Sequence, residues 1–320
     1  GLGFKNDLTG RENALLAAVL QGMTKSEAKS HLQAIGEFTE LGRFYDEPVK
    51  SYSSGMRTRL GFATGLLLDT DILLLDEILA VGDQSFRNKA REALSQKLTE
   101  DRTVILVHHA ENGRCVYSFC MCPGGFIVPA ATANGEVVVN GMSPSKRNNE
   151  FANSGIVVEI NVDKDIPKYE QFGALKGLEY QKNLERLAFT SGGRTQTAPA
   201  QRLTDFVEGN LSQDLNPTSY QPGLKSAPLH SLLPKLIGSN LRKGFESFGQ
   251  KMKGYYTAEA NVIGVESRTS SPVNIPRKEN LEHPEIKGLF PCGEGGGYAG
   301  GIVSAAMDGE RCAEAAIIGL

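Results

Sequence analysis

Residues 71–83 read Asp-Ile-Leu-Leu-Leu-Asp-Glu-Ile-Leu-Ala-Val-Gly-Asp, an apolar run that ends in the two carboxylates Asp76 and Glu77. A short apolar run bounded by charge is typical of a buried strand. A strand that delivers aspartate and then glutamate at its carboxyl end suits phosphoryl chemistry, in which Asp76 holds a magnesium ion and Glu77 polarises an attacking water. The same pattern also fits a strand that is followed by a solvated acidic turn.

The flanking sequence favours the phosphoryl interpretation. Upstream, Tyr52–Met56 places two hydroxyls and a glycine where a helix is expected to begin, and free backbone N–H groups at a helix start form an anion site. Downstream, a predicted helix over Gln84–Leu98 and an apolar strand over Thr103–Val107 lead to His108-His109 at the strand tip. A strand, a helix and a strand in this order predict a parallel α/β layer.

Residues upstream of this layer are helical in pattern. Thr9 and Glu12 fit a capped helix start, and further helices are predicted over Lys25–Leu41 and Arg57–Leu68. We expect a helical subdomain before the first strand.

Residues 1–109 resemble the ATP-binding subunits of ABC transporters, most closely the subfamily that exports polysaccharides and teichoic acids. The resemblance makes Tyr52–Met56 a divergent signature motif and Ala80–Asp83 the D-loop. It implies that Asp76 is the Walker B aspartate, Glu77 the catalytic glutamate and His109 the switch histidine. The implied nucleotide contacts are Ser53, Ser54, Gly55, Met56, Asp76 and Asp83, and Asp76 is the implied metal ligand. ATP and Mg²⁺ are the implied cofactors, and a second ATPase subunit and a membrane permease are the implied partners.

The family also needs a Walker A loop, which carries a Gly-Lys pair. Residues 1–320 contain no Gly-Lys dipeptide, so we expect that loop to lie upstream of Gly1. The first segment would then contribute at most half of a nucleotide site to a partner. Because the sequence opens on Gly1 and not on Met, we expect a fragment or a truncated reading frame.

A second informative stretch is the glycine-rich run near the carboxyl terminus. Gly295, Gly297 and Gly300 match G-x-G-x-x-G by letter, but only one helix fits after them, so we reject the dinucleotide fingerprint. We interpret the run as a strand over Gly288–Cys292 that delivers Glu294 to a cofactor.

The glycines that follow would let the backbone approach a flat ring. A final helix over about Gly301–Ile318 would point its positive end at that ring, which suits a flavin that gains negative charge on reduction. A glycine-rich turn that simply packs a carboxyl-terminal helix is the alternative interpretation.

Residues 108–320 resemble the carboxyl-terminal part of an uncharacterised family of FAD-dependent dehydrogenases. The matching stretches include Tyr117–Gly125, Val139–Ser143, Pro199–Arg202, Arg268–Pro272 and Gly293–Ile302. The resemblance implies that Gly293 and Glu294 meet the ribityl and pyrophosphate region of FAD. It places Gly300, Gly301 and Ile302 at the flavin ring, and Gly295, Gly297 and Tyr298 belong to the same cofactor-binding run. Because the family's amino-terminal βαβ unit is not in this sequence, we expect FAD binding to be weak or absent.

The predicted fold class is therefore α/β. A partial P-loop NTPase (ABC) domain with a helical subdomain occupies residues 1–109, and a partial α+β FAD-dependent oxidoreductase domain occupies residues 110–320. No linker rich in Gly, Ser or Pro separates them, which favours a chimeric or misassembled reading frame. The alternatives are a real fusion completed by partners, an exporter ATPase subunit, and a non-catalytic gene product.

Composition bears on the partners and the location that we expect for the protein. The net charge is −3 and no basic stripe is present, so we expect no nucleic-acid partner, and no apolar run is long enough for a membrane span. Five irregularly spaced cysteines predict no disulfide framework and a cytoplasmic location. Cys120 and Cys122 are compatible with structural thiols, a redox pair beside a flavin, or half of a metal site.

Overall fold

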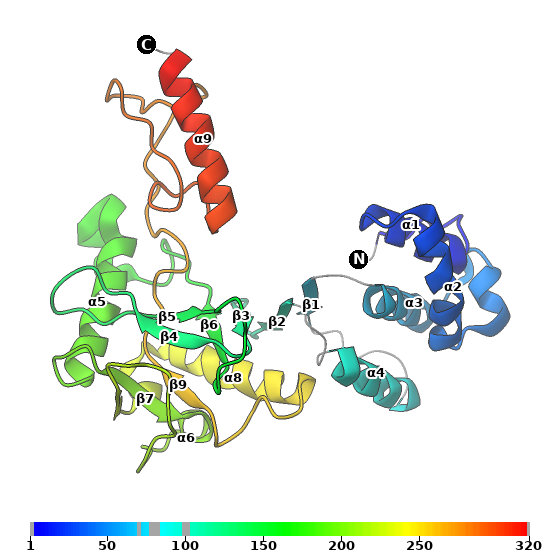
Figure 1. Ribbon diagram of the computed structural model, residues 1–320, viewed down its shortest axis with the longest axis horizontal. Coiled ribbons are helices and arrows are strands. Elements are labelled where there is room, and N and C mark those ends of the chain that lie inside the picture. The colour runs from blue at the N-terminus through cyan, green and yellow to red at the C-terminus, as the bar shows by residue number, and fades with distance from the viewer. Residues whose placement is uncertain (1–2, 69–71, 77–83, 98–102, 319–320) are drawn as a thin grey trace. The chain divides into compact units, whose positions relative to one another are not determined.

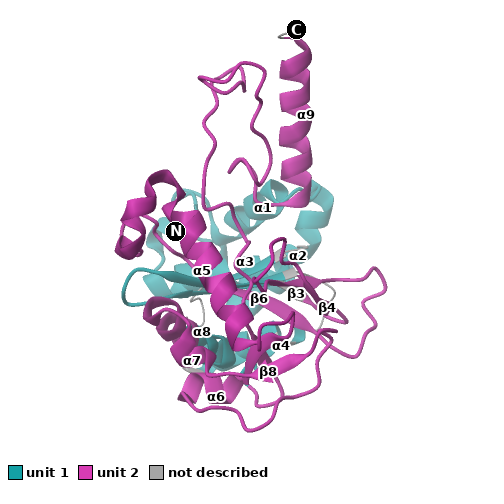
Figure 2. Ribbon diagram, turned by 90° about the vertical axis from the view of Figure 1, so that its left-hand side faces the viewer, with its two compact units in different colours: residues 1–121, 244–256 teal, residues 122–243, 257–320 magenta. Residues whose placement is uncertain are grey.

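The computed structural model describes residues 3–68, 72–76, 84–97 and 103–318 (Figure 1). These residues form two compact units. The first contains residues 1–121 and 244–256, and the second contains residues 122–243 and 257–320 (Figure 2).

The first unit begins with a helical bundle. It contains α1 (Gly10–Leu20), α2 (Lys25–Thr39), the 3-10 helices η1 (Gly42–Asp46) and η2 (Val49–Ser51), and α3 (Ser54–Leu67). Its core contains Ala14, Ala18, Leu32, Ile35, Tyr45 and Leu60. The capped start at Thr9 is confirmed, because Thr9 and Glu12 form a reciprocal capping box at α1. The second helix ends two residues before the predicted Leu41, since Glu40 adopts a left-handed conformation with φ of 56°.

The sheet of the first unit confirms the predicted parallel layer. Strand β1 (Ile72–Asp76) pairs in parallel with β2 (Thr103–His109), with Ile72 opposite Thr103 and Asp76 opposite Val107. Helix α4 (Gln84–Lys97) precedes β2 along the chain. Strand β3 (Cys115–Cys122) pairs antiparallel on the other edge of β2. Residues 244–256 pack on β3, where the Ser118 and Tyr255 hydroxyls lie 2.9 Å apart.

The second unit combines small sheets with surrounding helices. Strands β4 (Phe126–Pro129) and β5 (Val139–Met142) form an antiparallel ribbon, and β7 (Ala198–Arg202) pairs in parallel with β8 (Leu224–Ser226) and antiparallel with β9 (Asn261–Ile263). The core includes Val137, Val139, Ala188, Ala198 and Tyr220. The remaining elements are β6 (Asn153–Val158), η4 (Pro167–Leu175), α5 (Lys176–Ser191), α6 (Leu203–Glu208), α7 (Leu229–Leu232), α8 (Lys235–Lys251), whose last turns belong to the first unit, and α9 (Ile302–Ile318).

Three predictions for this unit are wrong. The polar composition of residues 192–220 predicts a loop, but this stretch contains β7 and α6, and Phe206 is fully buried. The sequence pattern predicts one helix over Leu229–Phe248, but the structure has two helices there, since Pro234 lies between α7 and α8 and has no N–H to donate. Residues Gly288–Cys292 form no strand, and their backbone bonds stay local, with the Leu289 amide donating to the Ile286 carbonyl.

Two strand boundaries also differ from the prediction. The sequence pattern predicts strands over residues 136–139 and 156–162. The first observed strand begins only at Val139, and the second ends at Val158.

Candidate functional site

The segment that resembles a signature motif forms an exposed helix start, as predicted. Ser53 caps α3, and its Oγ accepts a hydrogen bond from the Met56 amide at 3.3 Å. Ser53 and Ser54 are exposed, and a Cβ at Gly55 would meet only Ser53 Oγ, at 3.9 Å. Free N–H groups at such a helix start favour an anion.

The sheet brings two other predicted residues to one edge. Asp76 is the last residue of β1 and His109 is the last residue of β2, and the carboxyl ends of parallel strands lie at the same edge. His109 is exposed, and its Nδ1 lies 3.2 Å from Cys115 Sγ across the β2–β3 pair. Glu77 and Asp83 lie outside the described residues, as does the rest of the predicted D-loop.

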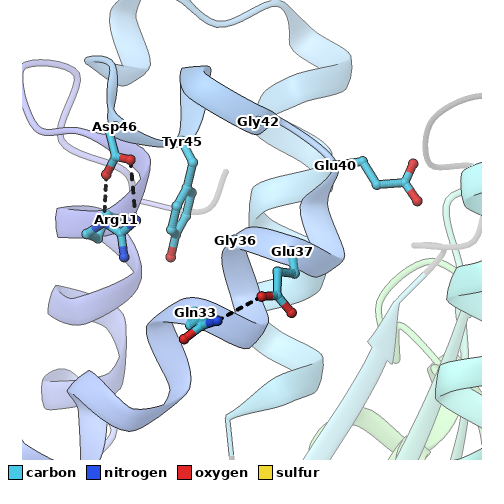
Figure 3. A pocket seen from close by; sticks show the side chains of 8 residues that line it. All are labelled: Arg11, Gln33, Gly36, Glu37, Glu40, Gly42, Tyr45 and Asp46. Carbon is cyan, nitrogen blue, oxygen red and sulfur yellow. Dashed lines mark hydrogen bonds and ion pairs between the residues drawn. The ribbon is translucent and has the colours of Figure 1, made fainter.

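A hollow of about 440 Å³ opens on the helical bundle (Figure 3). Arg11 lies on its wall, paired with Asp46 at 2.6 Å and stacked 4.9 Å from the centre of the Tyr45 ring. Glu37 and Glu40 add two more carboxylates to the lining. Asp46 is already paired with Arg11, and Glu40 is paired with Lys89 at 2.8 Å and with Arg59 at 3.5 Å, so most of the negative charge of the lining is neutralised within the bundle.

The glycine run folds into a tight turn. The Gly297 amide donates to the Glu294 carbonyl at 2.9 Å, and the Tyr298 amide donates to the Gly293 carbonyl at 3.0 Å. The Tyr298 hydroxyl donates to the Ile275 carbonyl at 2.7 Å, which ties the turn to the preceding segment. The predicted cofactor residues Gly293–Tyr298 therefore lie together, directly before the start of α9.

The backbone conformation and the packing of this chain are enough to require glycine at position 297. Its φ is +83°, and a Cβ at this position would lie 2.7 Å from the Val273 carbonyl oxygen. No cofactor is needed to explain it.

Gly295, Gly300 and Gly301 behave differently. A Cβ on Gly295 or Gly300 would meet no atom within 4 Å, and one on Gly301 would meet only Ser304 Oγ, at 3.6 Å. None of the three has a positive φ. Neither the backbone conformation nor the described packing requires glycine at these positions.

Sequence reasoning missed the ion pair that fixes the turn. Asp308 on α9 accepts hydrogen bonds from Arg277 at 2.8 and 3.0 Å and from the Gly293 amide at 2.9 Å. The Arg277 hydrogen bond, and then that of Gly293, lower the pKa of Asp308 to about 2. Arg277 also lies 3.6 Å from the centre of the Tyr298 ring. Helix α9 also carries Glu310, Arg311 and Glu314, so the sequence of the helix alone does not single out Asp308.

A second buried cluster stabilises the core of this unit. The Glu185 carboxylate accepts hydrogen bonds from the Arg268 guanidinium at 2.7 and 3.0 Å. Arg268 also forms an ion pair with Glu136 at 3.3 Å. Burial, followed by the neighbouring Glu185 charge, raises the pKa of Glu136. For Glu185, burial opposes ionisation, but hydrogen bonds led by that of Arg268 hold its pKa below the usual value. Two buried carboxylates thus share one guanidinium.

Of the two cysteines for which several roles are compatible with the sequence, the structure bears on Cys122. Cys122 is buried, and this burial raises the pKa of its thiol, which favours a structural thiol over a reactive one. The side chain of Cys120 lies outside the described part of the structure. Among the described residues, no group of three His, Cys, Asp or Glu side chains is arranged to hold a metal, and no helix has both the length and the apolarity to cross a membrane.

Comparison with protein families gives two matches. Residues 84–269, more than half of the chain, match the family described as FAD-dependent protein, C-terminal domain-like. Residues 2–80 match the ABC transporter family. The two resemblances drawn from the motifs are confirmed, and the chain joins an ABC ATP-binding segment to a segment like a FAD-dependent carboxyl-terminal domain.

Individual relatives divide between the two segments. An uncharacterized protein of Clostridium beijerinckii is 42% identical over 203 residues, which are 63% of this chain and 37% of that protein. An O-antigen export ATP-binding protein of Myxococcus xanthus is 46% identical over 109 residues, 34% of this chain and 25% of its own length. A teichoic acids export ATP-binding protein of Lactococcus lactis is 45% identical over 107 residues, 33% and 23% of the two chains.

The chain therefore spans between 23% and 37% of these relatives. A solved dimeric ATP-binding cassette in a post-hydrolysis state with ADP and Pi matches with a TM-score of 0.30 and 25% identity, over 35% of this chain and 50% of that one.

Proposed function

Because the chain belongs to the family of FAD-dependent proteins, C-terminal domain-like, we propose that residues 110–320 form the flavin-ring side of an FAD-dependent oxidoreductase. The observation that carries the proposal is the open face of Gly295, Gly300 and Gly301. Glycine has a conformational-entropy cost, and nothing internal to the described structure explains it at these three positions. A flat ring that lies against the backbone does explain it.

The residues present fit the ring end of the cofactor. The first N–H groups of α9 follow Gly301, and their positive end of the helix dipole favours negative charge on a ring placed there. The Asp308 contact fixes Gly293, and Glu294 is exposed beside it. When bound, FAD supplies the hydride and electron transfer. The chain's own residues position the ring and stabilise its charge.

Helix α9 also exposes a large apolar surface. Ile302 is 92% exposed and Val303 is 72% exposed at its first turn. Exposed apolar patches mark interaction sites. We propose that this surface lies against the bound ring or against a nucleotide-binding half supplied by another chain.

Flavin titration of matched variants tests the proposal. We expect the purified 320-residue chain to be colourless and to bind added FAD weakly, and Gly300→Val to abolish that binding because its side chain occupies the place of the ring. Gly309→Val is the control, since Gly309 lies on α9, the helix that follows Gly300, and its Cβ position is also open. Equal binding by the two variants would refute the placement, and a yellow protein with stoichiometric FAD would refute the expected weakness.

A second function is proposed for residues 1–109. The exposed start of α3 at Ser53 favours a signature-type segment that contacts nucleotide held by a partner. We expect no ATP hydrolysis by the chain alone, because the P-loop supplies most phosphate contacts in such sites. Turnover that Glu77→Gln abolishes would contradict this expectation.

A further inference from the structure

Two cysteines lie at the junction between the glycine turn and α9. Cys312 is buried on α9, and Cys292 is exposed directly before Gly293. Cys312 Sγ lies 3.7 Å from the Pro291 carbonyl oxygen, whose carbon is bonded to the Cys292 nitrogen. We propose that Cys292 and Cys312 are a redox-sensitive pair that closes to a disulfide and locks the glycine turn onto α9.

The contacts on both sides of Cys292 hold it against the helix. On one side, the Pro291 carbonyl reaches Cys312. On the other side, the Gly293 amide donates to Asp308 at 2.9 Å, and a Cβ on Gly293 would lie 3.7 Å from that of Ala305. The segment therefore follows one face of α9, with Cys292 between two residues that contact this helix. A disulfide needs this proximity before oxidation, because its Cα atoms must lie within about 7 Å.

The surroundings give the two thiols different roles. Cys292 is exposed and meets an oxidant from solution. Burial raises the pKa of Cys312, and the Asp308 charge adds to this, while the Arg277 guanidinium 3.3 Å from its sulfur favours the thiolate. Cys312 is thus shielded from external oxidants but placed to attack an oxidised Cys292.

The chemistry requires a two-electron oxidant, for which we name hydrogen peroxide. The Cys292 thiolate attacks one peroxide oxygen, so that an S–O bond forms, the O–O bond breaks and the leaving hydroxide takes up a proton as water. Cys312 then attacks the sulfenic sulfur, the S–O bond breaks, and a second water leaves with the Cys312 proton. Two thiols and one peroxide give one disulfide and two waters.

Peptide mapping of the full chain tests the pair, because Arg311 lies between the cysteines. After peroxide and alkylation, trypsin separates residues 288–311 from residues 312–320, and only a disulfide keeps them linked. We expect this linked pair, its release by dithiothreitol, and an intact mass lower by about 2 Da, the two thiol hydrogens.

Single substitutions separate a redox pair from mere proximity. Cys115→Ser is the control and should keep the link. Cys312→Ser should divert Cys292 to the sulfinic acid, since no resolving thiol remains. The same sulfinic acid in the parent chain, or a link from Cys292 to a different cysteine, would overturn the proposal.

Discussion

Replacing Asp308 by Asn removes the charge that holds the glycine turn on α9. The side chains of Arg277 and Asp308 are only 11% and 9% exposed, so solvent screens the pair weakly. The pKa of Asp308 falls from 3.8 to about 2. A shift of this size corresponds to about 2.5 kcal/mol of stabilisation at neutral pH, at about 1.4 kcal/mol per pKa unit. We expect Asp308→Asn to weaken the docking of α9 by about that amount, because Arg277 is left unpaired.

Hydrogen exchange of α9 amides measures this docking without requiring global unfolding. Because the folded pKa is depressed, the stabilisation is complete above the unfolded pKa of 3.8 and is lost as the pH falls through about 2. Parent and variant should therefore differ at pH 7 and converge near pH 2. The control is Glu310→Gln, which removes an exposed carboxylate of the same helix. Equal protection of parent and Asp308→Asn at pH 7 would refute the reasoning.

Three further predictions concern stability. Burial and the Glu185 charge raise the folded pKa of Glu136, so the stability of the parent falls as the pH rises from 4.5 through that raised pKa. The urea midpoint of Glu136→Gln should therefore change less between about pH 4 and 8 than that of the parent. Parallel pH profiles of the two proteins would contradict this. Thr9→Ala removes the capping box with Glu12 and should cost about 1 kcal/mol in thermal unfolding, whereas an unchanged midpoint would make the cap irrelevant. The two units should give two calorimetric transitions, and a single one with matching van't Hoff enthalpy would show one cooperative body.

Elements that local chemistry determines were predictable. Thr9 and Glu12 predict the start of a helix, and the apolar residues before Asp76 predict a strand. By contrast, Ala198–Arg202 contains no β-branched or aromatic residue and becomes a strand because β8 and β9 pair with it. Residues 288–292 have the apolar composition of a strand, but they pair with no strand in the part of the chain that the structure describes. A local sequence pattern cannot indicate whether a distant segment will pair with it.

The candidate site likewise has features that the local sequence predicts and features that it does not. The sequence predicts the glycine turn and the following helix, but it treats all of the glycines alike. The structure separates Gly297, which its backbone requires, from Gly300, which nothing internal requires. It also reveals the pairing of Arg277 with Asp308, residues 31 apart whose contact no periodicity encodes.

The junction between the two families lies inside a sheet. Strand β2, which itself lies within the FAD-dependent match over residues 84–269, pairs on one edge with β1 of the ABC-like match and on the other edge with β3 of the FAD-dependent match. An unpaired strand edge exposes a row of backbone donors and acceptors, so β3 stabilises β2 by covering it. The Ser118–Tyr255 contact adds the second layer. Division of the chain at residues 109 and 110 would strip this cover from β2 and separate His109 from Cys115. The first unit therefore depends on strands from both families, which explains why it extends to residue 121.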